Sequence, residues 1–346
     1  MSEKSQRSKP VLATVAALAG VSAPTVSKVI NGRDDVAAGT RARVQEALER
    51  LGYESPVQRR SRSAGPAMVE LVFDGINTQY SLEVLTGILD YASAEGVEIV
   101  LSSVTPRKLH NANHEEWAQR MVESGRKGLV LVTSEVTGKQ LDSFKRRSIP
   151  VVVIDPLNPP HSGFVSVGAT NWAGGKAATE HLIALGHERI AYLGGPEAAE
   201  CSVARLHGYL AALMGHGIPA RPGYALAGGF NQAFGASGAA NLLALPEPPT
   251  AIFAGSDDIA LGVLDEARRQ NVRVPEDISL VGFDGTALAE QTLPRLTSVA
   301  QPLKEMGRAA LRSVLRLAKG ETLDSLHVEL ATELVVRDST AVPPGP

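Results

Sequence analysis

The sequence predicts an α/β protein in two parts, a small helical N-terminal head and a larger core of parallel β-sheets. Residues 12–51 show helical periodicity without the alternation typical of strands. After Met68, short β-branched apolar runs alternate with amphipathic segments of about one helix length. The chain has 346 residues, 44% of them hydrophobic, which is enough for about two or three domains with a substantial core.

The head is expected to begin with two short helices, over residues 12–19 and 24–30. Their apolar faces would consist of Val15, Ala16 and Ala19 on the first helix and Val26, Val29 and Ile30 on the second. A third helix is expected in "TRARVQEALERLGY". The small side chain of Ala16 lets the first two helices cross closely.

The segment between these helices has the residues of a tight turn. Gly20 tolerates the left-handed conformation that ends a helix, and Val21 can fill the corner. Ser22 is a natural N-cap, with Pro24 in the first turn that follows. This spacing is typical of a helix-turn-helix, whose second helix enters the DNA major groove. A helical hairpin that binds no DNA is the structural alternative.

The core strands are expected in "MVELVFDG", "VEIVLSSV", "GLVLVTS", "PVVVID", "RIAYLGG", "YALAGGF", "TAIFAGSD" and "ISLVGFDG". Apolar strands that alternate with helices indicate parallel sheets covered on both faces. This many units exceeds one open sheet, which favours two doubly wound lobes. An eight-fold barrel is the competing architecture.

Several of these strands end in polar residues: Asp74, Asp155, Ser256, Asp257 and Asp284. Ligands of open parallel sheets bind beyond the carboxyl ends of the strands. If two lobes face each other, these ends would line a shared cleft. Some of these carboxylates must instead cap the helices that follow them.

Charge is distributed unevenly along the chain. Residues 1–62 carry 11 Lys and Arg against 6 Asp and Glu, and the remaining residues carry 23 against 31. A basic head on an acidic body indicates that only the head meets a polyanion. The alternative, a solvated disordered tail, fits residues 1–10 but not the periodic stretch after them.

The sequence indicates a cytoplasmic protein. No apolar run approaches the roughly 20 residues that span a bilayer, and the N-terminal positive charges are not followed by the hydrophobic region of a signal peptide. The one cysteine, Cys201, excludes an internal disulfide and is expected as a small buried side chain.

Several long stretches of the sequence resemble a known protein family. The stretch "VAALAGVSAPTVSKVINGRDDVAAGTRARVQEALERLGY" is similar to the DNA-binding head of the lactose-repressor (LacI/GalR) family. "DPLNPPHSGFVSVGATNWAGGKAATEHLIALGHERIAYLGGP", "SVARLHGYLAAL", "AIFAGSDDIALGVLDEARRQNVRVPEDISLVGFDG" and "LTSVAQPLKEMGRAA" resemble parts of its effector-binding core. The resemblance covers residues 11–338 and implies a periplasmic-binding-protein-like core of two lobes.

The resemblance implies a division of the chain. The expected parts are a tail (1–10), the helix-turn-helix domain (11–55), a hinge (56–66), the core (67–340) and a terminal tail (341–346). Lobe 1 would take residues 67–165 and 298–326, and lobe 2 residues 166–297 and 327–338.

The family's recognition helix reads bases from its first exposed positions, which correspond to Ala23 and Pro24, with Lys28 as a further contact. Because Ala and Pro offer no paired hydrogen bonds, readout there would use thymine methyl groups or DNA shape. Lys28 could contact guanine. The other DNA-facing residues, expected mainly at phosphates, are Thr14, Ser22, Thr25, Ser27, Asn31 and Thr40.

The hinge departs from the family pattern. Relatives insert a leucine into the minor groove, whereas "VQRRSRSAG" contains none. Ser55, Gln58 and Pro56 keep the residues of a capped short helix. Arg59, Arg60 and Arg62 would read the width and charge of a minor groove. A disordered basic tether is the alternative.

The resemblance also implies a small-molecule cleft in the core, with polar groups that orient the ligand and apolar walls that exclude water. Arg205 would donate to two adjacent oxygens, Asp155 and Asp284 would accept from hydroxyls, and Phe230 would stack on a sugar ring. The remaining expected residues are Asp74, Asn77, Tyr80, Trp172, Ser256, Asp257 and Gln301. For Trp172, helix packing is the alternative.

This residue set favours a neutral sugar as effector, with a purine as the alternative. Relatives carry a second aspartate where Gly285 stands, and we expect the glycine to leave space in the cleft for a disaccharide.

The sequence therefore predicts a ligand-controlled transcriptional regulator, most simply a homodimeric repressor of carbohydrate-utilisation genes that binds operator DNA. We expect no catalytic residue, cofactor or metal. The chain lacks the G-x-x-x-x-G-K-[ST], G-x-S-x-G and H-E-x-x-H motifs. An enzyme acting on sugars and a transport-type sugar-binding protein are the alternatives.

Overall fold

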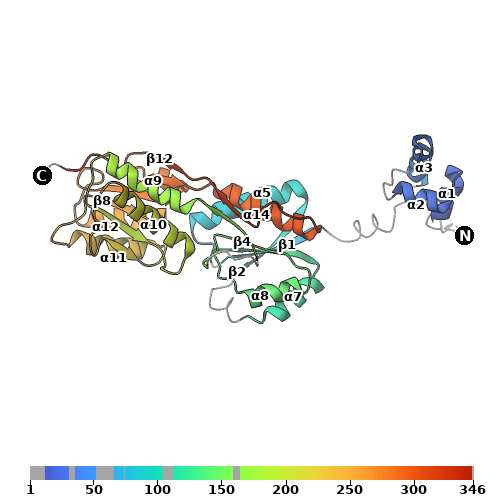
Figure 1. Cartoon of the computed structure of the whole chain (residues 1–346), viewed down its shortest axis with the longest axis horizontal. Helices are drawn as coiled ribbons and strands as arrows, with labels where there is room; N and C mark the ends of the chain where they lie inside the picture. The colour runs from blue at the N-terminus through green and yellow to red at the C-terminus, as the bar shows by residue number, and fades with distance from the viewer. Residues whose placement is uncertain are drawn as a thin grey trace, which may run out of the picture. The chain divides into compact units, whose positions relative to one another are not determined.

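The computed structural model describes residues 12–30, 36–51, 66–73, 75–103, 112–158 and 164–344 (Figure 1). The chain forms two compact units that divide between Pro66 and Ala67, called here the head and the core.

The head is a three-helix unit with α1 (Leu12–Ala19), α2 (Ala23–Ile30) and α3 (Ala38–Leu51). Its buried core consists of Val15, Ala16, Ala19, Val26, Val29, Val44 and Ala47. These are the apolar positions that helical periodicity selects, with Ile30 only partly buried at the edge.

The turn between α1 and α2 follows the predicted chemistry. Gly20 has φ +64°, and the N–H of Val21 donates to the carbonyl of Ala16 at 3.0 Å, which closes the end of α1. Ser22 Oγ accepts from the N–H of Thr25 at 3.4 Å and so caps α2. The two helices are bent by 101°, within the range of helix-turn-helix motifs. The predicted helix-turn-helix is confirmed.

The core contains two six-stranded sheets rather than one barrel, so the predicted two-lobe architecture is confirmed. The first sheet has the order β11-β5-β4-β3-β1-β2, and every pairing in it is parallel. Its strands are β1 (Ala67–Phe73), β2 (Val97–Ser103), β3 (Arg126–Val132), β4 (Val151–Ile154), β5 (Val165–Ala169) and β11 (His327–Leu330).

Helices cover both faces of the first sheet. On one face α5 (Gln79–Glu95) and α14 (Leu303–Ala318) pack against alternate strand residues. On the other face lie α7 (His114–Glu123) and α8 (Gly138–Lys145). The two apolar clusters interleave along each strand because successive side chains point to opposite faces.

The second sheet has the order β12-β10-β9-β8-β6-β7, with β12 antiparallel to β10. Its strands are β6 (Ile190–Gly194), β7 (Ala225–Ala227), β8 (Ala251–Ala254), β9 (Ser279–Asp284), β10 (Thr297–Ala300) and β12 (Glu333–Val335).

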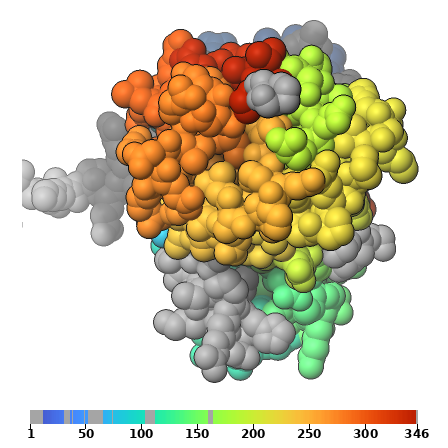
Figure 2. Space-filling model, turned by 90° about the vertical axis from the view of Figure 1, so that its left-hand side faces the viewer, coloured from blue at the N-terminus to red at the C-terminus, as the bar shows by residue number. Residues whose placement is uncertain are grey.

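Helices cover both faces of the second sheet. Helices α9 (Asn171–Ala184) and α10 (Glu200–Gly215) cover one face. Helices α11 (Gln232–Leu243) and α12 (Asp257–Arg269) cover the other, and the short α13 (Ala287–Gln291) follows β9. Figure 2 shows the second lobe from its outer side, with the segments drawn in yellow and orange at the front.

The chain passes between the lobes at residues 169–171, 300–303 and 330–333. Two of these crossings are joined, because Thr170 Oγ1 accepts from the N–H of Thr332 at 3.0 Å.

The lobe boundaries differ from those expected. Residues 165–169 and 327–330 belong to the first sheet, whereas the sequence assigned nearly all of them to lobe 2. Conversely, β10 belongs to the second sheet, although the sequence assigned residues 298–326 to lobe 1. Each crossing therefore lies a few residues later in the chain than expected.

Among the described residues, no single helix is long and apolar enough to cross a membrane. Only α1 and α2 taken together, across their bend, reach that length and composition.

Candidate functional site

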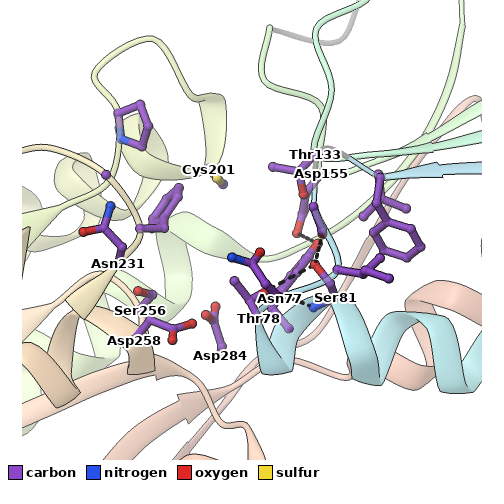
Figure 3. Close-up of a pocket in the computed structure, with 18 of the residues that line it drawn as sticks. Asn77, Thr78, Ser81, Thr133, Asp155, Cys201, Asn231, Ser256, Asp258 and Asp284 are labelled. Atoms are coloured by element: carbon purple, nitrogen blue, oxygen red, sulfur yellow. Dashed lines mark hydrogen bonds between the residues drawn. The ribbon is translucent and has the colours of Figure 1, made fainter. Parts of the chain in front are cut away.

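A cavity of about 1140 Å³ lies between the lobes, beyond the carboxyl ends of their central strands (Figure 3). Its polar lining consists of Asn77, Thr78, Tyr80, Ser81, Thr133, Asp155, Cys201, Arg205, Asn231, Gln232, Ser256, Asp258 and Asp284. Its apolar lining consists of Phe73, Ile76, Val132, Leu157, Pro196, Phe230 and Ala233. Both lobes contribute to both sets, so closure of the lobes would enclose a ligand. We call this cavity the cleft.

The wall formed by lobe 1 is built around Asp155, which follows β4 with a left-handed φ of +44°. The hydroxyl of Tyr80, in the first turn of α5, donates to Asp155 Oδ2 at 2.6 Å. Burial, reinforced by the charge of Asp155, raises the pKa of Tyr80 well above its usual range, so the hydroxyl keeps its proton. Burial raises the pKa of Asp155, and the Tyr80 hydrogen bond and the charge of Arg205 oppose this shift.

On the side of lobe 2, Arg205 projects from α10 and is 3% exposed. Its Nε donates to Asn171 Oδ1 at 2.8 Å, and its NH1 donates to the carbonyl of Gly255 at 2.5 Å. The guanidinium stacks on the ring of Phe283 at 3.8 Å. Burial by itself would lower the pKa of the Arg205 guanidinium. Nearby groups, with Asp284 the largest contributor, outweigh this effect, so the pKa is raised.

Asp284 ends β9 with φ +103° and lies 3.5 Å from Arg205 NH1. Gln301 Nε2 donates to Asp284 Oδ1 at 2.7 Å. Burial raises the pKa of Asp284 well above its usual range, the charge of Arg205 opposes this, and the charges of Asp257 and Asp258 add to it. Thus the ends of β4 and β9 and the start of α12 bring the carboxyl groups of Asp155, Asp284 and Asp258 to one cavity. The guanidinium of Arg205 lines the same cavity.

The structure brings together most of the effector residues expected from the sequence. The residues that line the cleft are Asn77, Tyr80, Asp155, Arg205, Phe230, Ser256 and Asp284. Phe230 lies 5.7 Å from the Arg205 guanidinium, ring centroid to carbon. Asp74 lies outside the described residues.

Three expected residues are not part of the lining. Trp172 is on α9 with 47% of its surface exposed. Asp257 is buried behind the wall, where Oδ2 accepts from the N–H of Thr286 at 2.7 Å and Oδ1 accepts from Ser298 at 2.6 Å. Gln301 also lies behind the lining and reaches the cleft only through Asp284.

The expectation that Gly285 leaves space in the cleft is wrong. Gly285 has φ +65°, and a Cβ there would lie 2.4 Å from the Cα of Ala300. The missing side chain is therefore explained by backbone crowding behind the cleft, and it does not enlarge the ligand space.

Sequence reasoning missed several lining residues. Asn231 caps α11, where its Oδ1 accepts from the N–H of Phe234 at 2.9 Å, and it follows the apolar Phe230 that was expected. Asp258 lines the cleft in place of Asp257, because successive residues of a helix point in different directions. Cys201 is buried as expected but lies at the cleft wall, where burial raises the pKa of its thiol to about 11.

In the head, Pro24 and Lys28 lie on the exposed side of α2, whereas Ala23 packs partly against the buried core. Ser22, Pro24 and Lys28 are exposed, and Ala23, Thr25 and Ser27 are half-buried. Thr14 is exposed in α1, and Thr40 is half-buried in α3. Asn31 and the hinge arginines Arg59, Arg60 and Arg62 lie outside the described residues, as do Ser55, Pro56 and Gln58.

Comparison with known proteins gives two family models. Residues 11–55 match the bacterial regulatory proteins of the lacI family, and residues 179–340 match a periplasmic binding protein-like domain. The catabolite control protein A of Priestia megaterium is 33% identical over 331 residues, covering 94% of this chain and 98% of that protein.

Two solved structures are also similar. The complex of the transcriptional regulator CelR with cellobiose has a TM-score of 0.70 and 32% identity, and the match covers 95% of this chain and 99% of that one. A lac repressor dimer bound to operator shares the fold with a TM-score of 0.69 at 24% identity, over 96% of this chain and 100% of that one.

A helix-turn-helix head joined to a two-lobed core with a polar cleft defines a ligand-responsive DNA-binding regulator. The relatives are transcriptional regulators rather than enzymes, as the sequence analysis predicts for this chain. The chain belongs to the LacI family of bacterial transcriptional regulators.

Proposed function

We propose that this protein is a repressor of carbohydrate-utilisation genes that a sugar bound in the cleft releases from operator DNA. The observation that carries the proposal is the chemistry of the cleft. Asp155, Arg205 and Asp284 form a buried array of acceptors and donors within a cavity that Phe230 and other apolar side chains also line. Several fixed polar groups on apolar walls suit a polyhydroxylated ring.

The sugar class has further support from a relative. The CelR structure is a complex with cellobiose, and its match extends over nearly the whole of this chain. We therefore place the sugar between Asp155 and Tyr80 on one side and Arg205, Ser256 and Asp284 on the other. Asn77 and Phe230 are proposed as additional contacts.

On the DNA side, we propose that α2 lies in the major groove. Ala23, Pro24 and Lys28 would face base edges. The remaining proposed contacts, at phosphates or the hinge, are Thr14, Ser22, Thr25, Ser27, Asn31, Thr40, Arg59, Arg60 and Arg62.

The proposed assembly is a homodimer that acts in the cytoplasm. The lac repressor, which shares the fold, binds its operator as a dimer. A two-fold dimer presents two heads to the two halves of a near-palindromic site. Sugar-dependent movement of the lobes would weaken operator binding by a coupling free energy of about 1–3 kcal/mol.

The test measures binding of the full chain to its own upstream DNA by gel shift, at fixed salt, with and without sugars. Preference for one fragment is expected, with release by cellobiose or another sugar by a factor of about 5–150. Equal affinity for every DNA fragment would contradict a regulatory function. Release by purines alone would replace the sugar with a purine effector.

A further inference from the structure

We propose that Asp258 gives the cleft charge selectivity, so that it admits an uncharged sugar and excludes an acidic sugar of the same size. This inference rests on the function proposed above and defines the property by which the same cleft selects its ligand.

The position of Asp258 supports this role. It is the second residue of α12, directly after the buried Asp257, and it is half-buried in the cleft lining. Figure 3 shows Asp258 on the same side of the cleft as Ser256 and Asn231, with Asn77 and Ser81 on the other side. A ligand held between these two sides must therefore approach the Asp258 carboxylate.

Asp258 forms no ion pair with a basic side chain in the described part of the chain. Burial raises the pKa of Asp258. Arg205 is the one basic side chain among the described lining residues. Its NH1 lies 3.5 Å from Asp284, so its charge already compensates that carboxylate.

The other carboxylates of the cleft have partners of their own. Asp155 accepts a hydrogen bond from Tyr80, and Asp284 accepts one from Gln301. The charge of Asp258 also reaches Asp284, since it contributes to the raised pKa of that carboxyl. The cleft thus has three carboxyl groups and one guanidinium, and Asp258 is the carboxyl group that forms no hydrogen bond or ion pair with the described residues.

The same carboxylate acts in opposite directions on two kinds of sugar. Hydroxyl groups donate short, strong hydrogen bonds to a carboxylate, so an uncharged sugar gains from Asp258. An anionic group about 6 Å away is repelled strongly enough to weaken binding about tenfold or more, at an effective dielectric constant of about 20. Selectivity then comes from a repulsive element as well as an attractive one.

The experiment compares neutral sugars with their acids by isothermal titration calorimetry on the full chain. The neutral sugars are glucose, maltose and cellobiose, and the acids are glucuronate, maltobionate and cellobionate. Asp258→Asn removes the charge and keeps the size of the side chain. Asp265→Asn is the matched control on the same helix, where Asp265 is 59% exposed and lies 3.5 Å from Arg268, outside the cleft.

We expect the wild type to bind at least one neutral sugar about tenfold or more tightly than the corresponding acid. Asp258→Asn should reduce this ratio about tenfold, while Asp265→Asn should leave it unchanged. Thermal unfolding of each variant, measured without ligand, reports whether the fold is intact.

Two results would overturn the selectivity while leaving a sugar effector in place: equal binding of a sugar and its acid by the wild type, or an unchanged ratio in folded Asp258→Asn. A different result would be the absence of binding by all three proteins, while the wild type still prefers one DNA fragment. That outcome would reject the sugar effector itself, and the selectivity with it.

Discussion

At the scale of single residues, the first sheet contains a buried acid that lies outside the cleft. Glu70 in β1 is 4% exposed, and its Oε1 accepts from Trp117 Nε1 at 3.2 Å and from Ser102 Oγ at 3.1 Å. Arg126 NH1 lies 3.1 Å from Oε2, which accepts no hydrogen bond. The contribution of Arg126 is therefore mainly to neutralise a charge that water cannot reach.

Arg126→Leu should lower the free energy of unfolding by about 3 kcal/mol, because it leaves the Glu70 carboxylate buried and unpaired. The measurement is urea denaturation at neutral pH. Adding Glu70→Gln should recover most of the loss, since the amide oxygen can still accept from Trp117 and carries no charge. A double variant no more stable than Arg126→Leu would contradict this explanation.

A second buried residue makes stability depend on pH. His187 is 1% exposed, and its ring lies within 3.0 Å of hydrogen-bonding atoms of Thr250, Ser279 and Ala341. Burial lowers the pKa of His187, the backbone bond to Ala341 opposes the shift, and the charge of His181 adds to it. The neutral ring is thus the form that joins the C-terminal segment to lobe 2.

The contribution of His187 should be complete above its unfolded pKa of about 6.5 and should be lost as the pH falls through its lower folded pKa. His187→Gln should therefore be less stable than wild type at pH 8, and the difference should narrow toward pH 5. Free energies of unfolding measured across this range test the sign. A difference that widens in acid would show that the buried form is the charged one.

At the scale of elements, α9 and α10 pack closely because glycines remove side chains where they cross. A Cβ on Gly208 of α10 would lie 2.2 Å from the carbonyl oxygen of Trp172 and 2.7 Å from the backbone nitrogen of Lys176. Neither backbone atom can move without shifting α9. The crossing therefore requires glycine at this position.

Gly208→Ala should destabilise the core by about 1–3 kcal/mol through overpacking. Gly215→Ala is the control in the same helix, because a Cβ there would meet no atom within 4 Å. The control should be neutral or stabilising by up to about 1 kcal/mol. Thermal melts of the two variants decide the question, and equal melting temperatures would mean that the helices adjust freely.

The same scale explains which strands could be predicted from the sequence. The eight expected strands all form. Six of them contain runs of buried apolar residues, whereas the apolar residues of β2 and β7 are half-buried or exposed. The short β11 and β12 at the sheet edges have exposed or half-buried residues. In β10, Thr297 and Ser298 are fully buried. The Thr297 hydroxyl accepts from the N–H of Arg337 and the Ser298 hydroxyl donates to Asp257, which satisfies the polar groups that make the segment look like a loop.

The cleft also contains some residues that could be predicted from the sequence and others that could not. Residues at strand ends could be predicted because the carboxyl ends of parallel strands meet at one edge. The choice of Asp258 over Asp257 depends on the direction in which α12 starts, and the crowding at Gly285 depends on β10, a strand that the sequence hides. Both required the three-dimensional arrangement of neighbouring elements.

At the scale of the whole core, two hydrogen bonds of the described residues connect the lobes away from their three crossings. The N–H of Glu200, at the start of α10, donates to the carbonyl of Leu157 at 3.1 Å. Glu83 Oε1, on α5 of lobe 1, accepts from the N–H of Ala287 at 3.2 Å, at the start of α13 in lobe 2. The two residues are 204 positions apart in the chain. This contact exists only when the lobes are arranged as described, so it stabilises that arrangement over any in which they separate.

Glu83→Ala should therefore weaken sugar binding, although Glu83 does not line the cleft. If a sugar binds the arrangement that contains this bond, its apparent dissociation constant rises in proportion to the lost population of that arrangement. A hydrogen bond to a charged group contributes about 1.5–3 kcal/mol, and because this one is exposed we expect the lower end, a loss of about tenfold. Calorimetry with the sugar that releases the wild type from DNA measures this change in the dissociation constant.

Asp90→Ala is the control, because Asp90 lies on the same helix and pairs with Arg308 within lobe 1, at 3.4 Å. Equal affinity in the two variants would mean that the Glu83 hydrogen bond does not affect the arrangement of the lobes.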